Sequence, residues 1–304
     1  MIAPLVLFAF NRPLHTKRLL ESVAQSSIAK ETDLIAYIDS PIEIKDLVLN
    51  QEVEKIIKNF LGFKSIVVIR RGCNFGLSKN IIGGITDVLN TSKKVIVLED
   101  DLLVSPNFLE YMNDALNYYE NKKNVWHISG YTEYFGSDDV DKSFFWRTMH
   151  CWGWATWGDR WQFFEKNTDS LLEKFNPSMI NDMNLYGAIN FWDQVILNKK
   201  NKIDTWAIYW YATIFLNKGL CLNPYVSYVR NTGFDGSGTN CKEGNNKKLE
   251  HQLNQKGGFY PPKKIEENME VVGKLIEVFV NQRVTSLPNK IFFKLVNIFR
   301  RVCQ

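Results

Sequence analysis

The sequence has no paired-cysteine motif and few histidines. Its five Cys are odd in number and scattered, with no CxxC pair and no Cys/His spacing that would hold zinc. The four His form no motif either. These absences argue against a disulfide framework and a zinc site. We expect the thiols to be small core side chains in a reducing compartment.

An excess of charge of one sign is also absent. Lys and Arg number 37 against 33 Asp and Glu, which leaves a net charge of only +4, and there is no arginine-rich arm. Because proteins that bind nucleic acid present a strongly basic surface, the sequence predicts no nucleic-acid partner.

No apolar run is long enough to span a bilayer. The N-terminal stretch MIAPLVLFAFNRP is apolar but short, and it lacks both a basic start and a signal-cleavage pattern. We therefore expect it to form a buried strand, and we expect the protein to be cytoplasmic.

What the sequence does contain is an alternation of short apolar segments with helical patterns. The segments cover residues 5–10, 34–38, 66–69 and 95–98. Strands joined by helices make right-handed crossovers and a parallel sheet. We predict an α/β fold with a mainly parallel sheet flanked by helices, in a single domain over residues 1–287.

Charged residues follow each of these apolar segments. In chain order they are Arg12, Asp39, Arg70, Arg71, Glu99, Asp100 and Asp101. In parallel sheets, ligands bind beyond the carboxyl ends of the strands. The sequence therefore predicts a binding site at this edge of the sheet.

The acidic trio of Glu99, Asp100 and Asp101 is the strongest single signal. Three adjacent carboxylates repel one another unless a cation neutralises them. Carboxylate oxygens suit Mg²⁺ or Mn²⁺, which can bridge a protein to a diphosphate. The alternative is a solvated acidic turn before a helix, whose dipole favours negative charge.

The trio and its surroundings, LEDDLLVSPNF at residues 98–108, resemble the metal-binding segment of N-acetylglucosaminyltransferase I and related GT-A glycosyltransferases. The resemblance spans roughly residues 4–235 and implies the GT-A (Rossmann-like) fold. It implies that Asp101 binds the metal and that Glu99 and Asp100 face the sugar or ribose. It also implies that Arg12 lies near the nucleotide and that Asp39 contacts the uracil and ribose.

The segment RRGCNFGLSKN, residues 70–80, resembles the loop that approaches the nucleotide in such enzymes. Asn74 and Lys79 would then bind the donor. Gly76 would let the backbone come close, and the Lys79 charge would offset the donor phosphates. The alternative is an ordinary turn with a helix cap.

Two further segments resemble the same family. CWGW at residues 151–154 is similar to the glycine-aromatic segment before the acceptor site, so Trp152 and Trp154 are candidates for a floor beneath a sugar. Core packing is the alternative for each Trp. The glycine-rich residues 233–238 correspond to a loop that closes over the donor in related enzymes.

Transfer to an acceptor hydroxyl needs one carboxylate as general base. Asp204 stands where a helix is expected to begin, at a spacing before the GLCLNP segment that resembles the catalytic Asp of inverting GT-A enzymes. Asp193, in FWDQ, resembles the acidic motif of the N-acetylglucosaminyltransferase I branch but lies farther from GLCLNP. The spacing favours Asp204, and Asp193 is the second candidate.

Within the domain, about residues 1–110 would bind the nucleotide-sugar and about 111–287 the acceptor. Residues 288–304 combine an apolar helical stripe with basic residues. This tail fits an interfacial helix at the cytoplasmic face of an inner membrane, where lipid-linked acceptors reside. Docking on its own domain or on a second subunit is the alternative.

The sequence thus predicts an inverting, metal-dependent glycosyltransferase, using Mn²⁺ or Mg²⁺. It would transfer a hexosyl or N-acetylhexosaminyl group from a UDP-linked donor to a saccharide or lipid-linked saccharide, in bacterial surface polysaccharide synthesis. A sugar nucleotidyltransferase is one alternative, although FAFNRP lacks the glycine-rich loop that it would need after the first strand. A carbohydrate-binding protein without turnover is the other.

Overall fold

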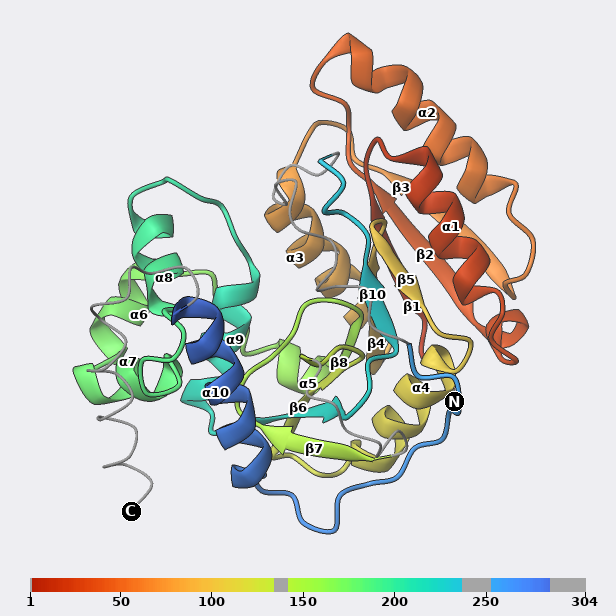
Figure 1. Ribbon diagram of the computed structural model, residues 1–304. Helices are drawn as coiled ribbons and strands as arrows, with labels where there is room; N and C mark the ends of the chain where they lie inside the picture. Colours follow the sequence, from red (N-terminus) through yellow and green to blue (C-terminus); the bar gives the residue numbers. More distant parts are fainter. Residues whose placement is uncertain (1, 134–141, 237–252, 285–304) are drawn as a thin grey trace.

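The computed structural model describes residues 2–133, 142–236 and 253–284. An eight-stranded sheet of order β3-β2-β1-β4-β8-β6-β9-β7 runs through the centre, and β5 and β10 form a separate ribbon (Figure 1). The strands are β1 (Leu5–Ala9), β2 (Asp33–Ile38), β3 (Ser65–Arg70), β4 (Lys94–Glu99), β5 (Leu102–Val104), β6 (Val125–Ser129), β7 (Ser143–Trp146), β8 (Trp154–Trp157), β9 (Leu220–Pro224) and β10 (Val229–Asn231). The helices are α1 (Pro13–Val23), α2 (Ile44–Lys58), α3 (Gly76–Leu89), α4 (Phe108–Tyr119), α5 (Gly158–Trp161), α6 (Thr168–Lys174), α7 (Pro177–Met183), α8 (Trp192–Lys199), α9 (Ala207–Leu216) and α10 (Met269–Val284), with a short 3-10 helix at Ala29–Glu31.

The predicted α/β fold with a mainly parallel sheet is confirmed. Strands β3, β2, β1 and β4 run parallel to one another, and β6 is parallel to β9. Within the eight-stranded sheet the antiparallel pairings all involve β7 or β8, from the less regular second half of the chain, and the separate β5–β10 ribbon is antiparallel as well. The four predicted strands correspond to β1 to β4, with ends that differ by one residue.

Both faces of strand β1 are buried, which explains why its sequence is apolar throughout. Val6 and Phe8 lie in the core beneath α3. Leu5, Leu7 and Ala9 lie in the opposite core, beneath α1 and α2. Because successive side chains of a strand point to opposite faces and both faces are covered, no position in β1 can be polar.

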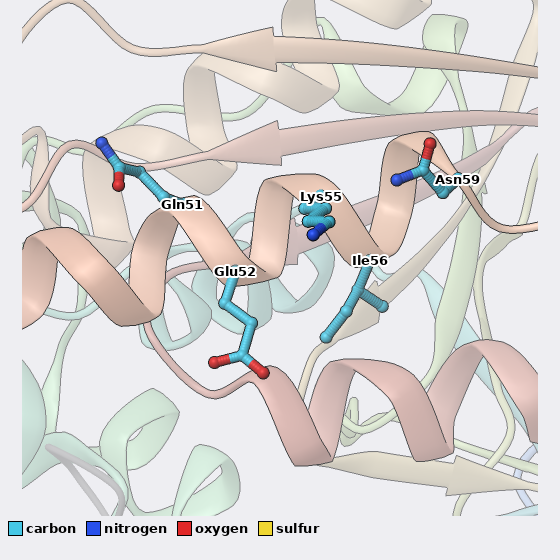
Figure 2. A pocket seen from close by; sticks show the side chains of 5 residues that line it. All are labelled: Gln51, Glu52, Lys55, Ile56 and Asn59. Atoms are coloured by element: carbon cyan, nitrogen blue, oxygen red, sulfur yellow. The ribbon is translucent and has the colours of Figure 1, made fainter.

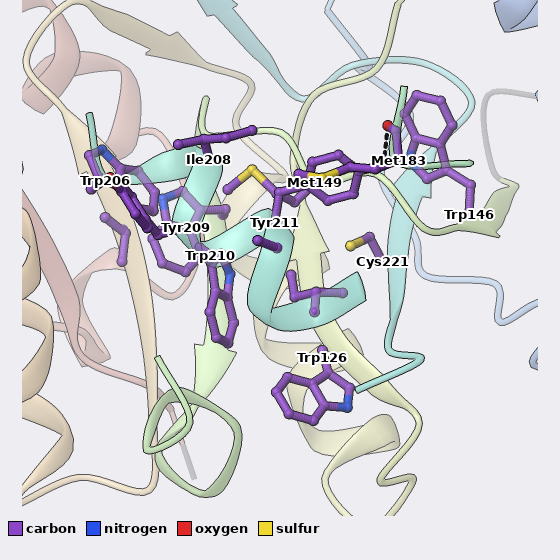
Figure 3. Packing of buried hydrophobic residues seen from close by; sticks show 14 of the residues in the cluster. Trp126, Trp146, Met149, Met183, Trp206, Ile208, Tyr209, Trp210, Tyr211 and Cys221 are labelled. Carbon is purple, nitrogen blue, oxygen red and sulfur yellow. Dashed lines mark hydrogen bonds between the residues drawn. The ribbon is translucent and has the colours of Figure 1, made fainter. Parts of the chain in front are cut away.

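The aromatic residues of the second half fill a core around α9. Seven of the ten residues of α9 are buried. Figure 3 shows Trp210 and Tyr211 of α9, and Trp206 just before it, packed among side chains from other segments. Trp154 is 0% exposed, with ring centroids 5.2 Å from Trp206 and 5.1 Å from His127. Trp154 is therefore buried between His127 and Trp206, the N-cap residue of α9, which fits the core-packing alternative better than a sugar floor.

No helix in the described part of the chain is long and apolar enough to cross a membrane. The tail predicted to be amphipathic, residues 288–304, lies outside the described residues. Its membrane-contact and docking alternatives therefore remain predictions, as does the division of the domain into donor and acceptor halves.

Candidate active site

The adjacent parallel strands β2, β1 and β4 bring the predicted polar residues to one edge of the sheet. Phe8 of β1 is in register with both Tyr37 of β2 and Glu99 of β4. Beyond these pairs, the Asp39 amide donates to the Ala9 carbonyl at 3.1 Å, and the Asp100 amide donates to the Phe8 carbonyl at 3.1 Å. The turns that carry Asp39 and Asp100 are thus fixed on either side of β1.

Arg12 bridges two members of the acidic trio. Its Nη1 lies 3.1 Å from Asp101 Oδ2, and its Nη2 forms an ion pair with Asp100 Oδ1. The other Asp100 oxygen accepts from the Phe10 amide at 3.3 Å. Burial by itself would lower the pKa of Arg12, but Asp100 and Asp101 raise it above its ordinary value, so the guanidinium stays charged. The terminal nitrogens of Arg12 thus contact the acidic trio, and its predicted place near the nucleotide stays a prediction.

The trio holds more negative charge than Arg12 neutralises. Burial, and then repulsion from Asp101 and Asp100, raises the pKa of Glu99 to about 8. Burial also raises the pKa of Asp100, against the opposing effect of Arg12. Three carboxylates beside one guanidinium therefore leave a site that would favour a further cation.

The carboxylate oxygens at this edge of the sheet fit a divalent metal ion that a substrate would also coordinate. Within the described residues no group of three His, Cys, Asp or Glu side chains converges to hold a metal by itself. Both Asp100 oxygens are engaged, whereas Asp101 contacts Arg12 through Oδ2 and retains Oδ1 for another ligand. Asp101 is thus the residue that would hold Mn²⁺ or Mg²⁺, with phosphate oxygens as further ligands.

Asp39 organises the loop that follows β3. Its Oδ1 accepts from the Ser40 amide at 2.9 Å and from the Phe75 amide at 2.8 Å. Asn74 adds a second tie, because its Nδ2 donates to the Ser40 carbonyl at 2.6 Å. Its Oδ1 accepts from the amide of Gly76, whose φ of +71° suits glycine. Asn74 therefore shapes the loop with both ends of its amide, whereas Asp39 keeps Oδ2 for a ligand.

Cations surround Phe75 at the start of α3. Lys79 Nζ lies 4.3 Å from the Phe75 ring centroid. The Arg71 guanidinium lies 5.0 Å from the same ring, but it also donates from Nε to Asn80 Oδ1 at 2.8 Å. Arg70 is held by Glu54 and Asn50. Among these cations, Lys79 is the one whose ammonium has no carboxylate partner within the described residues.

The turn after β10 lies directly over Asp101. Thr232 donates to the Asp101 carbonyl from its amide at 2.7 Å and from Oγ1 at 2.8 Å. His15 Nε2 lies 3.1 Å from Asp235 Oδ2, which connects the same turn to α1. Part of the predicted glycine-rich loop thus lies at the acidic trio; residues 237 and 238 are outside the described residues.

Gly233 is the residue of this turn that lies against the Asp101 side chain. A methyl group at this position would collide with Asp101 Oδ2 and lie 3.0 Å from Asp101 Cβ and Cγ.

We expect Gly233→Ala to displace the Asp101 carboxylate and lower kcat by about 10-fold or more, since small misplacements of catalytic groups are costly. Steady-state kinetics would measure this. Gly273→Ala, where a methyl group meets nothing within 4 Å, is the control; equal activity of the two variants would contradict the expectation.

Trp152 remains a candidate for sugar contact. It is partly exposed, with ring centroids 4.5 Å from Tyr131 and 5.9 Å from Phe234. Phe234 belongs to the turn over Asp101, so Trp152 contacts the turn that covers the trio. The sequence did not single out Tyr131 or Phe234, although an aromatic residue inside the glycine-rich stretch was a usable signal.

The two candidate bases lie in different surroundings. Asp204 was expected at a helix start, but α9 begins at Ala207 with Trp206 as its N-cap residue. The Asp204 side chain is 64% exposed and forms an ion pair with Lys166, whose Nζ also donates to Ser78 Oγ at 2.7 Å. Asp204 is thereby connected to α3, whose start belongs to the predicted donor site. Asp193 is exposed in the first turn of α8, and nothing in the described contacts ties it to the trio.

A surface depression of about 560 Å³ lies elsewhere, along the outer side of α2 (Figure 2). Its lining residues are Gln51, Glu52, Lys55, Ile56 and Asn59. None of them is a predicted site residue, so this depression is separate from the edge that carries Asp101.

No protein-family model and no curated protein matches the chain. Among solved structures it is similar to S. aureus TarS, with 16% identity and a TM-score of 0.33 over 47% of this chain; it spans 25% of that chain's length. It is also similar to the mannosyltransferase PcManGT from Pyrobaculum calidifontis in complex with GDP-Man and Mn²⁺. That match has 8% identity and a TM-score of 0.40, and covers 72% of this chain and 70% of the other. Both TM-scores are below 0.5, so neither similarity identifies the function of this chain.

Proposed function

We propose that the chain is a metal-dependent GT-A glycosyltransferase that moves a sugar from a nucleotide-sugar to an acceptor hydroxyl. The observation that supports this most is the incompletely neutralised acidic trio at the carboxyl edge of the sheet, with Arg12 as its partner and the β10 turn above it. Parallel α/β sheets bind their ligands at this edge.

A divalent ion at Asp101 would neutralise the donor diphosphate and stabilise it as a leaving group, and Glu99 and Asp100 would face the sugar or ribose. The chain's own residues position the substrate around it. Asp39 Oδ2 accepts from the nucleoside, and Lys79 offsets phosphate charge at the start of α3. Trp152 and Phe234 give the sugar an apolar wall.

We propose that Asp204 is the general base that takes the proton of the acceptor hydroxyl, with Asp193 as the alternative. A single displacement at the anomeric carbon then inverts its configuration, because the chain supplies one base and forms no covalent intermediate. The acceptor is a saccharide or lipid-linked saccharide, and the donor is UDP-linked. The cellular role that we propose is bacterial surface polysaccharide synthesis at the cytoplasmic face of the inner membrane.

A nucleotide-sugar panel tests the proposal. UDP-linked and GDP-linked hexoses and N-acetylhexosamines are incubated with Mn²⁺, with and without saccharide acceptors, and nucleotide release is measured. We expect release that depends on both metal and acceptor. Sugar binding without release by any donor would favour the carbohydrate-binding alternative. Formation of nucleotide-sugar from sugar phosphate and nucleoside triphosphate would favour the nucleotidyltransferase.

Asp39→Asn should weaken nucleotide binding without unfolding the loop. Asparagine retains an oxygen for the Ser40 and Phe75 amides but replaces Oδ2 with a donor group. The loss of one charged hydrogen bond predicts an affinity about 10-fold lower or more. Calorimetry with UDP and Mn²⁺ measures it. Asp33→Asn, at the opposite end of β2 and paired with Lys64, is the control; equal affinities would refute the role of Asp39.

A further inference from the structure

Lys166 links two parts of the chain that the proposed function assigns to different substrates. It lies in the loop between α5 and α6, and 29% of its side-chain surface is exposed. Its ammonium donates to Ser78 Oγ on α3 at 2.7 Å and forms an ion pair with Asp204 Oδ1. One side chain therefore connects the start of α3 to the segment that precedes α9.

The α3 end of this link is well fixed. Ser78 is 1% exposed and lies in the first turn of α3, next to Lys79. The loop before it is tied to the end of β2 through Asn74 and Phe75. A group bound to Ser78 Oγ is thus held relative to the donor edge of the sheet.

The backbone beside Asp204 is fixed as well. Thr205 and Asn198 of α8 exchange two hydrogen bonds: the Thr205 amide donates to Asn198 Oδ1 at 3.1 Å, and Asn198 Nδ2 donates to Thr205 Oγ1 at 2.9 Å. The Asp204 side chain, by contrast, projects into solvent with 64% of its surface exposed. Its rotamer is therefore held mainly by Lys166.

The loop that carries Lys166 is anchored on its far side. Asn167 caps α6 by accepting from the Ser170 amide at 3.1 Å, and Thr168 Oγ1 lies 2.6 Å from the Tyr209 hydroxyl of α9. An exposed ion pair contributes little to folding stability. A lysine held from both sides against an exposed carboxylate is better suited to orienting that carboxylate.

We propose that Lys166 is a positioning residue, which holds Asp204 at a fixed place relative to the donor-binding end of α3. This proposal rests on the proposed function, in which Asp204 accepts the proton of the acceptor hydroxyl. Lys166 orients the carboxylate, and the Ser78 hydroxyl orients Lys166. The donor and the base thereby share one rigid frame, as a direct displacement requires.

The test compares Lys166→Met with Lys199→Met. Lys199 forms an ion pair of the same kind with Asp169, in the same part of the chain, without contact to α3. We expect Lys166→Met to lower kcat by about 10-fold or more and to leave the affinity for UDP with Mn²⁺, or for GDP if the panel selects a guanosine donor, unchanged. Lys166→Arg should recover part of the loss, and Lys199→Met should behave as wild type.

A second comparison separates positioning from folding. In the Asp204→Asn background, Lys166→Met should cause no further loss, because the group that it orients no longer acts as a base. If the wild type transfers sugar and the two Met variants have equal kcat, the role of Lys166 is overturned while the proposed function stands. An additional loss in the double variant, or a parallel loss of nucleotide affinity, would overturn that role as well. A wild type that transfers no sugar in the panel would overturn the proposed function and this inference together.

Discussion

Asp101→Ala is expected to remove nearly all turnover while the fold stays intact. The substitution deletes the carboxylate that retains an oxygen for the metal, and loss of such electrostatic stabilisation typically lowers kcat by about 10²–10³-fold. The local backbone should survive, because Thr232 binds the main-chain carbonyl of Asp101 rather than its side chain. Steady-state turnover and metal-dependent nucleotide binding measure the effect, with thermal melting as the check on folding.

Asp87→Ala is the matched control for Asp101→Ala. It removes a carboxylate of α3 whose side chain is 56% exposed and which pairs with Arg71, away from the trio. We expect its turnover to match the wild type and to vanish with EDTA. The metal hypothesis is wrong if purified Asp101→Ala keeps wild-type turnover in the presence of EDTA.

Asp204→Asn should slow the chemical step by about 10²–10⁴-fold, the usual contribution of a general base. Asparagine keeps an oxygen for Lys166 but cannot accept the acceptor proton at neutral pH, so the link to Ser78 can persist. Donor affinity should be unchanged, because the base acts on the acceptor. Single-turnover kinetics and nucleotide calorimetry separate the two effects.

The comparison for Asp204→Asn is Asp193→Asn in the same assay. Asp193 is exposed in the first turn of α8, so we expect its replacement to be tolerated. An inactive Asp193→Asn beside an active Asp204→Asn would reverse the assignment. NMR of the product should show inverted anomeric configuration, and retention would exclude the one-base mechanism for either Asp.

The edge of the sheet was predictable because its signals are local. Continuous apolar runs mark strands covered on both faces, and the residues directly after such runs lie at the carboxyl edge. Asp39 and the trio were located in this way. The order β2-β1-β4, which makes Asp39 and the trio neighbours on either side of β1, is given only by the folded chain.

Side-chain partners from distant segments could not be predicted. The contacts of Arg12 with Asp100 and Asp101, about 90 residues later in the chain, depend on the register of β1 against β4. Lys166 was not predicted as a functional residue, because a single Lys in an irregular segment belongs to no recognisable sequence pattern. Its link to Ser78 and Asp204 exists only in the folded chain.

The sequence by itself determined the fold class and placed the acidic trio at the edge of the sheet that carries the candidate site, because strand periodicity and adjacent charges are properties of neighbouring residues. Only the tertiary structure decided which aromatic residues reach that site. Trp152 and Trp154 are two residues apart, but Trp206, the N-cap residue of α9, stacks on Trp154, whereas Trp152 is partly exposed beside Phe234. Whether a helix some 50 residues away covers one ring and not the other depends on packing, which no local pattern encodes.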